Sequence, residues 1–199
     1  MRVAGLIALW RFPMWEQTLT QLLMLCDKVF VRFDERDGDM SIPPKAISLM
    51  GDQYGAFFIS DDKWTKAGWR EDLLRSIDDY KPDLVLFPDE DEMYGDGITD
   101  DLAGFYSSDK AYMMFEYETP LPTDDGRIVN NGKPYPGLPH MKAFKWKLGL
   151  TYHPYPTLAR LASYGKDDAY SASTKMLHYC FYTKEEEDRH IFNKMKERG

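Results

Sequence analysis

Four consecutive acidic residues at the end of an apolar run form the group in this chain best suited to bind a cation. The run, Leu-Val-Leu-Phe at 84–87, lies between two prolines and predicts a short buried strand. The acids that follow it are Asp89, Glu90, Asp91 and Glu92. Crowded carboxylates repel one another, and a divalent cation relieves this repulsion best. Oxygen ligands suit Mg²⁺ or Mn²⁺ held together with a substrate's phosphates. A solvated acidic turn is the alternative interpretation.

Strands and helices alternate through the first half of the chain. Apolar patterns predict strands at 3–9, 28–33, 56–59 and 84–87, with helices at 15–26, 43–50 and 69–77 between them. This alternation predicts right-handed crossovers and a largely parallel sheet. Asp34, Asp61 and Asp89 each follow a strand end. We therefore expect them to line one negatively charged crevice, where open α/β sheets bind their ligands.

The second half of the chain has a different pattern. Apolar and polar residues alternate over 110–119, which predicts one strand whose solvent-exposed face carries Glu116 and Glu118. Asp-Asp-Gly at 124–126 and Asn-Asn-Gly at 130–132 predict tight hairpin turns. Further strands are expected at 141–152 and 156–161, and a charged helix at 184–197. We expect the lysine side chains of segment 142–147 to be exposed to solvent. The alternative is that this segment contacts a sugar or an acidic acceptor.

Composition narrows the class of protein. The chain has 199 residues, of which 43% are hydrophobic, enough for a sizeable core in a single domain. A formal net charge of −8 argues against broad contact with a nucleic-acid backbone or an anionic membrane. Two cysteines are too few for a disulfide framework. No apolar run reaches eighteen residues and no signal-peptide pattern is present, so we expect a cytoplasmic protein without a membrane span.

In this order of elements the chain resembles a small glycosyltransferase of the GT-A fold, from the family-2-like clan. Segment 84–92 resembles that family's strand followed by an Asp-any-Asp motif and a Glu. Segment 140–146 resembles its acceptor-side strand, and His178 with Tyr179 resembles its C-terminal His-Tyr element. The resemblance implies one GT-A-like (Rossmann-like) α/β domain over 1–199, with a mixed, mainly parallel sheet flanked by helices. Residues 1–100 would form its nucleotide-sugar-binding half and residues 101–199 its acceptor-side half.

The resemblance also implies a chemistry, the metal-dependent transfer of a sugar from a UDP- or GDP-sugar. The acceptor would be a glycan, a protein or a modified nucleic acid. The metal site for Mn²⁺ or Mg²⁺ would consist of Asp89, Asp91 and His178. Asp91 would bind the ion directly, Asp89 would reach the ribose or a metal-bound water, and His178 would be a further ligand. Glu92 would stay near the metal or the sugar as an accessory. Residues two apart in an extended segment point the same way, so Asp89 and Asp91 are expected to face the cleft together.

Several of these residues have equally simple structural interpretations. Asp34 and Asp61 are expected to contact the ribose and the base, but acids at strand ends also cap the following helix. Arg70 is expected to bind the diphosphate, or else to pair with Glu71 or Asp72 in its own helix. His178 would otherwise be a buried, hydrogen-bonded histidine.

The general base of an inverting transfer and the overall function also leave alternatives open. Glu116 and Glu118 are the candidates for the base, which must lie across the sugar from the leaving group. A nucleotidyltransferase on a similar sheet is the first alternative function, although Gly5 stands alone where a glycine-rich phosphate loop would favour it. A non-catalytic carbohydrate-binding or assembly protein that retains the fold is the second.

Overall fold

A computed structural model describes residues 1–9, 14–35, 39–60, 66–122, 128–134, 139–147, 150 and 166–179. Its elements in chain order are β1 (Val3–Leu9), α1 (Trp15–Leu25), β2 (Lys28–Asp34), α2 (Ile42–Met50), η1 (Gly51–Gln53), β3 (Tyr54–Ser60), α3 (Lys66–Ser76), β4 (Leu84–Leu86), β5 (Glu92–Tyr94), α4 (Ile98–Ser107), β6 (Tyr112–Phe115), β7 (Tyr117–Pro122), β8 (Ile128–Pro134), β9 (His140–Lys145), η2 (Lys166–Asp168), β10 (Ala169–Ser171) and β11 (Met176–His178).

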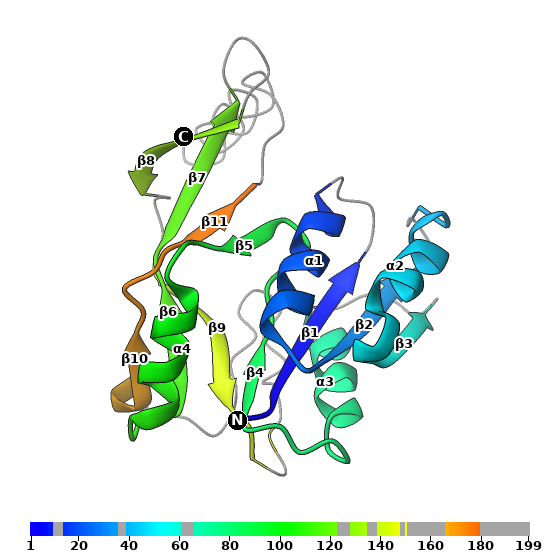
Figure 1. Cartoon of the computed structure of the whole chain (residues 1–199), viewed down its shortest axis with the longest axis horizontal. Helices are drawn as coiled ribbons and strands as arrows, with labels where there is room; N and C mark the ends of the chain where they lie inside the picture. Colours follow the sequence, from blue (N-terminus) through cyan, green and yellow to red (C-terminus); the bar gives the residue numbers. More distant parts are fainter. Residues whose placement is uncertain are drawn as a thin grey trace, which may run out of the picture.

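A seven-stranded sheet with the order β10-β6-β9-β4-β1-β2-β3 forms the centre of the molecule (Figure 1). Strands β4, β1, β2 and β3 are parallel to one another, whereas β9 runs antiparallel to both β4 and β6. The predicted α/β class, with a mixed and mainly parallel sheet flanked by helices, is confirmed. Because parallel strands end at the same edge, the carboxyl ends of β2, β3 and β4 all lie along one edge of this sheet.

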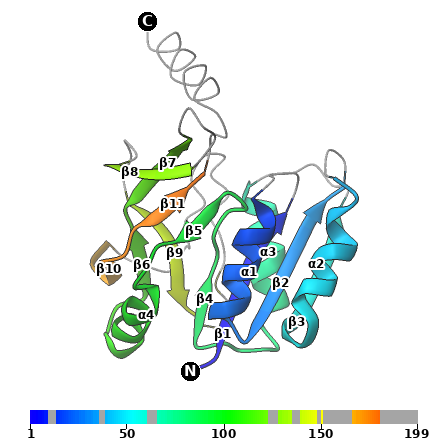
Figure 2. The same ribbon diagram turned by 45° about the horizontal axis from the view of Figure 1, so that its top comes forward.

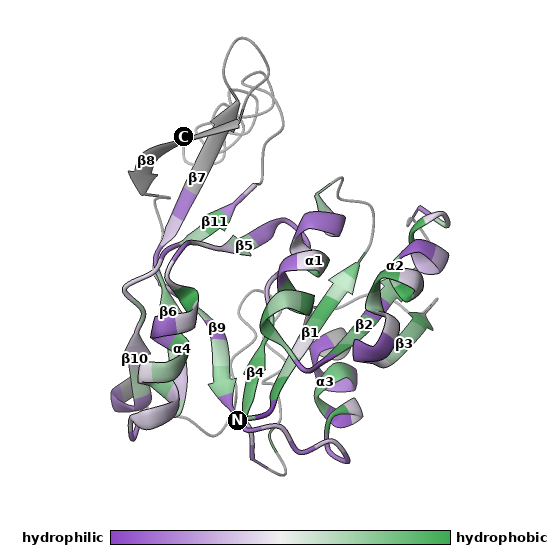
Figure 3. Ribbon diagram, in the orientation of Figure 1, coloured by the Kyte–Doolittle hydropathy of each residue, from purple (hydrophilic) through white to green (hydrophobic). Residues whose placement is uncertain are grey.

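Helices cover both faces of the sheet, and β1 shows why. All seven of its residues are buried, as expected for a central parallel strand. Successive side chains point to opposite faces, and β1 accordingly contributes to two separate apolar clusters. One cluster joins β1 to α1, α2 and α4, and the other joins it to α3. Figure 2 shows α1 and α3 on either side of β1. Figure 3 shows β1 and β4 as largely hydrophobic, in contrast to the mixed surfaces of the helices.

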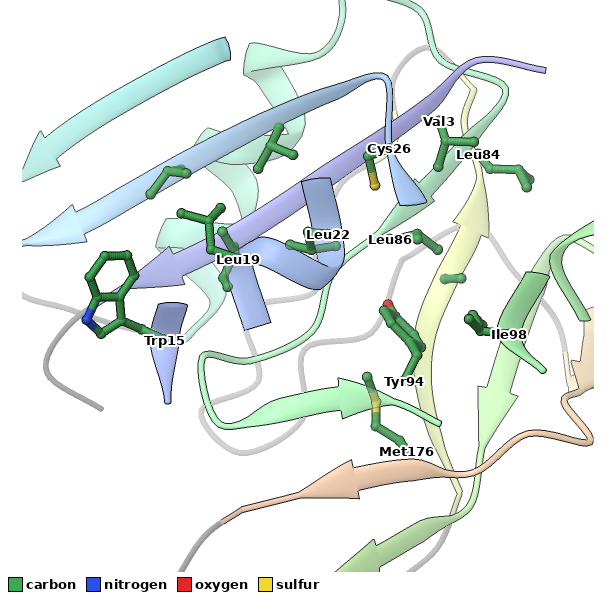
Figure 4. Close-up of a cluster of buried hydrophobic side chains, with 14 of the residues drawn as sticks. Val3, Trp15, Leu19, Leu22, Cys26, Leu84, Leu86, Tyr94, Ile98 and Met176 are labelled. Atoms are coloured by element: carbon green, nitrogen blue, oxygen red, sulfur yellow. The ribbon is translucent and has the colours of Figure 1, made fainter. Parts of the chain in front are cut away.

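The first cluster packs α1 against the main sheet and β5 (Figure 4). Leu19 and Leu22 of α1 are fully buried, and Trp15 closes the cluster at the start of the helix. Tyr94 of β5 belongs to the same cluster, with its ring edge-on to Phe115 at a centroid distance of 5.3 Å. The strand that begins at the last of the four acids is thus part of the main core.

A second sheet of four strands, in the order β5-β11-β7-β8, extends from the end of the main sheet (Figure 1). Strand β11 lies antiparallel to β5 and parallel to β7, and β8 pairs antiparallel with β7. Since β5 begins at Glu92, the acidic run lies where the two sheets meet. This position differs from that of Asp34, which ends an ordinary strand of the main sheet.

The structure corrects several expected elements. The single strand expected over 110–119 is two strands in two different sheets, because the chain passes from β6 to β7 at Glu116. The prediction of a tight hairpin turn at 130–132 is wrong, since Asn131 and Gly132 lie inside β8. Strand β9 ends at Lys145, well before residue 152, and the sequence analysis missed α4 and β5. The elements expected at 156–161 and 184–197 lie outside the described residues.

Among the helices that the structure describes, none has the length and apolar character needed to cross a membrane.

Candidate functional site

Helix α1 fixes the acidic segment from one side. Thr18 Oγ1 donates a hydrogen bond to the Glu90 carbonyl at 3.0 Å. One turn on, the Gln21 amide binds both backbone groups of Tyr94, at 2.6 Å to its carbonyl and 2.7 Å from its N–H. A short strand such as β5 has few ladder bonds of its own. These side-chain bonds therefore hold the acids against the main core.

The four acids form a turn. The Glu92 N–H donates to the Asp89 carbonyl at 3.1 Å, and the Glu92 Oε2 accepts the Asp89 N–H at 2.7 Å. We expected an extended segment in which Asp89 and Asp91 face the cleft together. The backbone instead adopts a turn. Each of the two aspartates has a different set of partners.

Asp89 lies between two cations. Its Oδ1 accepts a hydrogen bond from Arg70 Nη2 at 3.0 Å, and its Oδ2 accepts one from Lys142 Nζ at 2.9 Å. The Arg70 guanidinium also lies over the Phe87 ring, with Cζ at 5.7 Å from the ring centroid. Two residues that the sequence analysis assigned to donor binding, Arg70 and Asp89, are thus in direct contact.

The acids suggested as alternative partners of Arg70 have other cations beside them. Glu71 forms an ion pair with Arg75 at 3.5 Å, and Asp72 forms one with the buried Arg32. The structure consequently directs Arg70 from α3 toward the acidic turn.

Lys142 and Glu92 form a buried ion pair. The Lys142 Nζ lies 2.6 Å from Glu92 Oε2, and the two residues are only 3% and 2% exposed. Glu92 Oε1 accepts a further hydrogen bond from the Tyr117 hydroxyl at 2.5 Å. Burial alone would lower the pKa of Lys142, but the charges of Asp89 and Glu92 outweigh it and raise that pKa. The ammonium is therefore held in its charged form.

Sequence reasoning missed Lys142, which it expected in water with the other lysines of the segment. A signal was present, because residues two apart on a strand share a face and the apolar Phe144 lies two positions after Lys142. Lys142 lies on that buried face of β9, and it needs the two carboxylates as partners.

Asp91 faces a different element, strand β11. The His178 Nε2 lies 3.3 Å from Asp91 Oδ2, and the Asp91 carbonyl accepts the Tyr179 N–H at 2.7 Å. The β5–β11 register places His178 opposite Glu92. As a result, possible ligand atoms of Asp91, Glu92 and His178 all lie within 4.8 Å of one another. The metal-binding role that the resemblance implies for His178 stays a prediction.

Three stacked rings support the His178 side of the site. The Tyr117 ring lies between those of His140 and His178, with centroid distances of 4.6 Å and 5.3 Å. Burial, and then the charge of Glu92, raise the pKa of Tyr117 far above its usual value, so its hydroxyl remains a donor. Burial and the nearby Lys142 lower the pKa of His140, which favours its neutral form. The stack fixes the plane of the His178 imidazole.

The remaining predicted site residues lie in different surroundings. Asp34 ends β2 at the expected edge of the main sheet, and Asp61 lies outside the described residues. Glu116 is exposed between the two sheets. Glu118 is in β7 and forms an ion pair with Lys175 at 2.8 Å. Their assigned roles stay predictions.

Asp91 and His178 fit the divalent ion that the resemblance implies. They offer a carboxylate oxygen and an imidazole nitrogen whose separation of 3.3 Å lets both bind one ion. Both oxygens of Asp89 and both of Glu92 already accept hydrogen bonds from protein groups. A metal held here would therefore take two protein ligands most readily.

Comparisons with known proteins give the following similarities. The sequence matches no family model, and no curated protein matches it. Among solved structures, TarS from S. aureus aligns with a TM-score of 0.43 and 14% identity, over 66% of this chain and 23% of the TarS chain. HddC from Yersinia pseudotuberculosis aligns with a TM-score of 0.49 and 9% identity, over 95% of this chain and 97% of HddC. The 4-diphosphocytidyl-2C-methyl-D-erythritol synthase from Anaerococcus prevotii aligns with a TM-score of 0.45 and 12% identity, over 72% of this chain and 70% of the synthase chain.

The chain thus spans less than a quarter of the TarS chain. Because all these TM-scores are below 0.5, the similarities carry no inference about function.

Proposed function

We propose that this chain is a metal-dependent glycosyltransferase that transfers a sugar from a UDP- or GDP-sugar to an acceptor. The observation that supports this most is the cluster at the carboxyl end of β4. There Asp91, Glu92 and His178 come within 4.8 Å of one another, beside the cations Arg70 and Lys142. The resemblance of segment 84–92 to the Asp-any-Asp motif of such enzymes points the same way.

The cluster has the parts that departure of a nucleoside diphosphate requires. Negative charge develops on the leaving phosphates and must be neutralised, which a bound divalent ion does without proton transfer. Asp91 and His178 would hold that ion. Since imidazole nitrogen suits transition metals better than Mg²⁺, we favour Mn²⁺. Arg70 has the planar guanidinium that binds phosphate oxygens in pairs, and it would help to orient the diphosphate.

Nucleoside and acceptor would bind on opposite sides of this cluster. Asp34, at the end of β2, and Asp61, which follows Ser60 in the sequence, remain our candidates for the ribose hydroxyls and the base. On the side of the small sheet, Glu116 and Glu118 remain the candidates for the general base. Glu118 would have to release Lys175 in order to act, whereas Glu116 is exposed.

Thermal denaturation with a panel of nucleotide sugars, with and without Mn²⁺, tests donor binding. A ligand that binds only the folded protein adds about 2.7 kcal/mol to the free energy of unfolding when its free concentration is about 100 times its Kd. We expect a rise in Tm with a UDP- or GDP-sugar plus Mn²⁺. Absence of a shift with every pair would rule out a nucleotide-sugar donor.

Turnover is tested by product analysis and by one substitution. Transfer or slow hydrolysis of the donor releases UDP or GDP, whereas nucleotidyl transfer from a nucleoside triphosphate to a sugar 1-phosphate releases pyrophosphate. Asp91→Asn is expected to abolish release of UDP or GDP while the protein stays folded. Asp100→Asn is the matched control, because Asp100 is an exposed aspartate in α4 outside the cluster. Full activity of the Asp91 variant would refute the metal assignment.

A further inference from the structure

The acidic cluster already contains a cation of its own, the Lys142 ammonium. It lies 2.6 Å from Glu92 Oε2 and 2.9 Å from Asp89 Oδ2. The backbone of Lys142 is held as firmly as its side chain. Its carbonyl accepts hydrogen bonds from the Phe87 N–H at 3.1 Å and from the Tyr94 hydroxyl at 2.7 Å. Because both its side chain and its backbone are held, Lys142 cannot leave the cluster without breaking buried hydrogen bonds.

Half of the negative charge of the turn is therefore balanced before any metal binds. The four acids at 89–92 carry four negative charges, and Lys142 with Arg70 supplies two positive ones. A cluster of three uncompensated carboxylates would attract a divalent ion strongly. Here the fixed ammonium repels such an ion and occupies two of the carboxylates.

The phosphates of a nucleotide reverse this effect. They bring negative charge to Arg70 and Lys142, and they provide the oxygen ligands that Asp91 and His178 alone do not supply. Mn²⁺ and Mg²⁺ commonly bind through one or two protein groups with phosphates and water in the other positions. Each ligand would then raise the affinity for the other by the same factor, as linkage requires.

We propose that Lys142 acts as an internal counter-ion that keeps the affinity of the empty site for free Mn²⁺ low, so that the metal binds together with the nucleotide diphosphate. This inference rests on the proposed function, since it assumes a nucleotide donor. It makes Lys142 a positioning and charge-setting residue with no part in the bond-breaking step. The role would also account for the presence of a lysine on the buried face of β9.

Titration of Mn²⁺ followed by electron paramagnetic resonance of the free ion tests this directly. For the wild type we expect weak binding of Mn²⁺ alone, and binding at least about tenfold tighter with saturating UDP or GDP, a factor that corresponds to about 1.4 kcal/mol of coupling. Lys142→Met is expected to bind Mn²⁺ alone at least tenfold tighter than the wild type. Its gain from the nucleotide is expected to be smaller, because the carboxylates freed by the substitution already hold the ion.

Two further variants separate the charge effect from a loss of structure. Lys175→Met removes another Lys–Glu ion pair, the 2.8 Å contact with Glu118, and should leave the affinity for Mn²⁺ unchanged. Lys142→Gln removes the same charge as Lys142→Met but keeps a hydrogen-bond donor, and it serves if the methionine variant does not fold. Thermal denaturation gives a second measurement. Mn²⁺ alone should raise the Tm of either Lys142 variant more than that of the wild type.

Each result bears on one proposal only. If the Lys142 variants bind Mn²⁺ no tighter than the wild type, the counter-ion role is wrong, even where nucleotide-dependent binding upholds the proposed function. The counter-ion role would also be overturned if the wild type bound Mn²⁺ as tightly without nucleotide as with it. If neither UDP nor GDP binds in the presence of Mn²⁺, the proposed donor is wrong. The effect of Lys142 on Mn²⁺ alone would still be measured in that case.

Discussion

The His178 imidazole Nε2 lies 3.3 Å from the Asp91 carboxylate, although the two residues come from opposite halves of the chain. The antiparallel pairing of β11 with β5 brings them together, and the Tyr179 N–H closes the contact by donating to the Asp91 carbonyl. The two side chains are 18% and 23% exposed, so solvent and a ligand can reach them. This partial exposure distinguishes the pair from the buried Lys142–Glu92 ion pair beside it.

Replacing His178 by Ala should weaken metal binding without unfolding the protein. The imidazole is one of the two ligands we assign to the ion, so we expect the affinity for Mn²⁺ in the presence of UDP or GDP to fall at least about tenfold. Isothermal titration calorimetry measures this, and near-wild-type circular dichroism controls for folding. His140→Ala is the matched control, because His140 stacks on the other side of Tyr117 and belongs to no proposed ligand set. Equal losses in both variants would contradict the assignment.

The Tyr117 hydroxyl should contribute measurably to stability. Tyr117→Phe keeps the ring between the two histidines but removes the 2.5 Å hydrogen bond to Glu92. The buried carboxylate oxygen then loses a partner, which should cost about 1–3 kcal/mol in the free energy of unfolding. Urea denaturation gives the value. Tyr106→Phe, at an exposed position of α4, should change stability by less than about 0.5 kcal/mol. A Tyr117→Phe variant as stable as this control would show that the bond is weak.

Much of the first half of the fold was predictable because its signals are local. The run at 84–87 is apolar on both faces and ends in four acids, and it forms β4 with the acids at its carboxyl end, as expected. The same holds for α1, whose apolar residues recur at helical spacing. Helix α4 was missed although Ile98, Leu102 and Phe105 also have helical spacing. The turn signal before it and two aspartates in its first turn obscured the pattern.

The arrangement of the site was less predictable because it depends on contacts between distant segments. Nothing near Lys142 in the sequence shows that its amine meets Asp89 and Glu92, since that contact requires β9 to lie beside β4. Nor does the alternation over 110–119 show where the chain changes sheets. The proximity of His178 to the acids was expected only from the resemblance. Local patterns predicted the strand ends, whereas the partners of each carboxylate required the three-dimensional structure.

Gly95→Ala should disturb the pairing that brings His178 to Asp91. The Gly95 N–H donates to the Lys175 carbonyl at 2.9 Å, and a Cβ at Gly95 would lie only 2.8 Å from that same oxygen. A backbone atom cannot move away as a side chain can, so we expect β11 to shift from β5. The free energy of unfolding should fall by about 1–3 kcal/mol. The affinity for Mn²⁺ with nucleotide should fall as well.

Gly104→Ala is the control for this prediction. A Cβ at Gly104 would meet only the far end of the Tyr170 side chain, at 2.6 Å from its hydroxyl oxygen, so a side chain and not the backbone would have to shift. Alanine also favours the helix by up to about 1 kcal/mol relative to glycine. We expect Gly104→Ala to have near-wild-type stability and unchanged metal binding. If both variants lose metal binding to the same degree, the loss does not come from the β5–β11 pairing.

Asp101 should make the anchoring of β11 sensitive to acid. Its carboxylate accepts hydrogen bonds from the Ser173 N–H at 3.0 Å, the Ser173 hydroxyl at 2.9 Å and the Thr174 N–H at 2.7 Å, and so joins α4 to the segment before β11. Burial alone would raise the pKa of Asp101, but the bonds from Thr174 and Ser173 outweigh it and lower the pKa below 3.8. A group whose pKa is lower in the folded state stabilises the fold above its unfolded pKa. This stabilisation is lost as the pH falls through the folded pKa.

Asp101→Asn should therefore be less stable than the wild type at pH 7 by about 1–3 kcal/mol, because the amide nitrogen cannot accept the bonds that one carboxylate oxygen accepted. The difference should shrink below about pH 4, where protonation weakens the same bonds in the wild type. Urea denaturation of both proteins between about pH 3 and 7 measures the two slopes. Asp100→Asn, at the exposed neighbouring position, should follow the wild-type curve throughout. A constant difference between the Asp101 variant and the wild type across this range would mean that Asp101 does not carry the pH dependence.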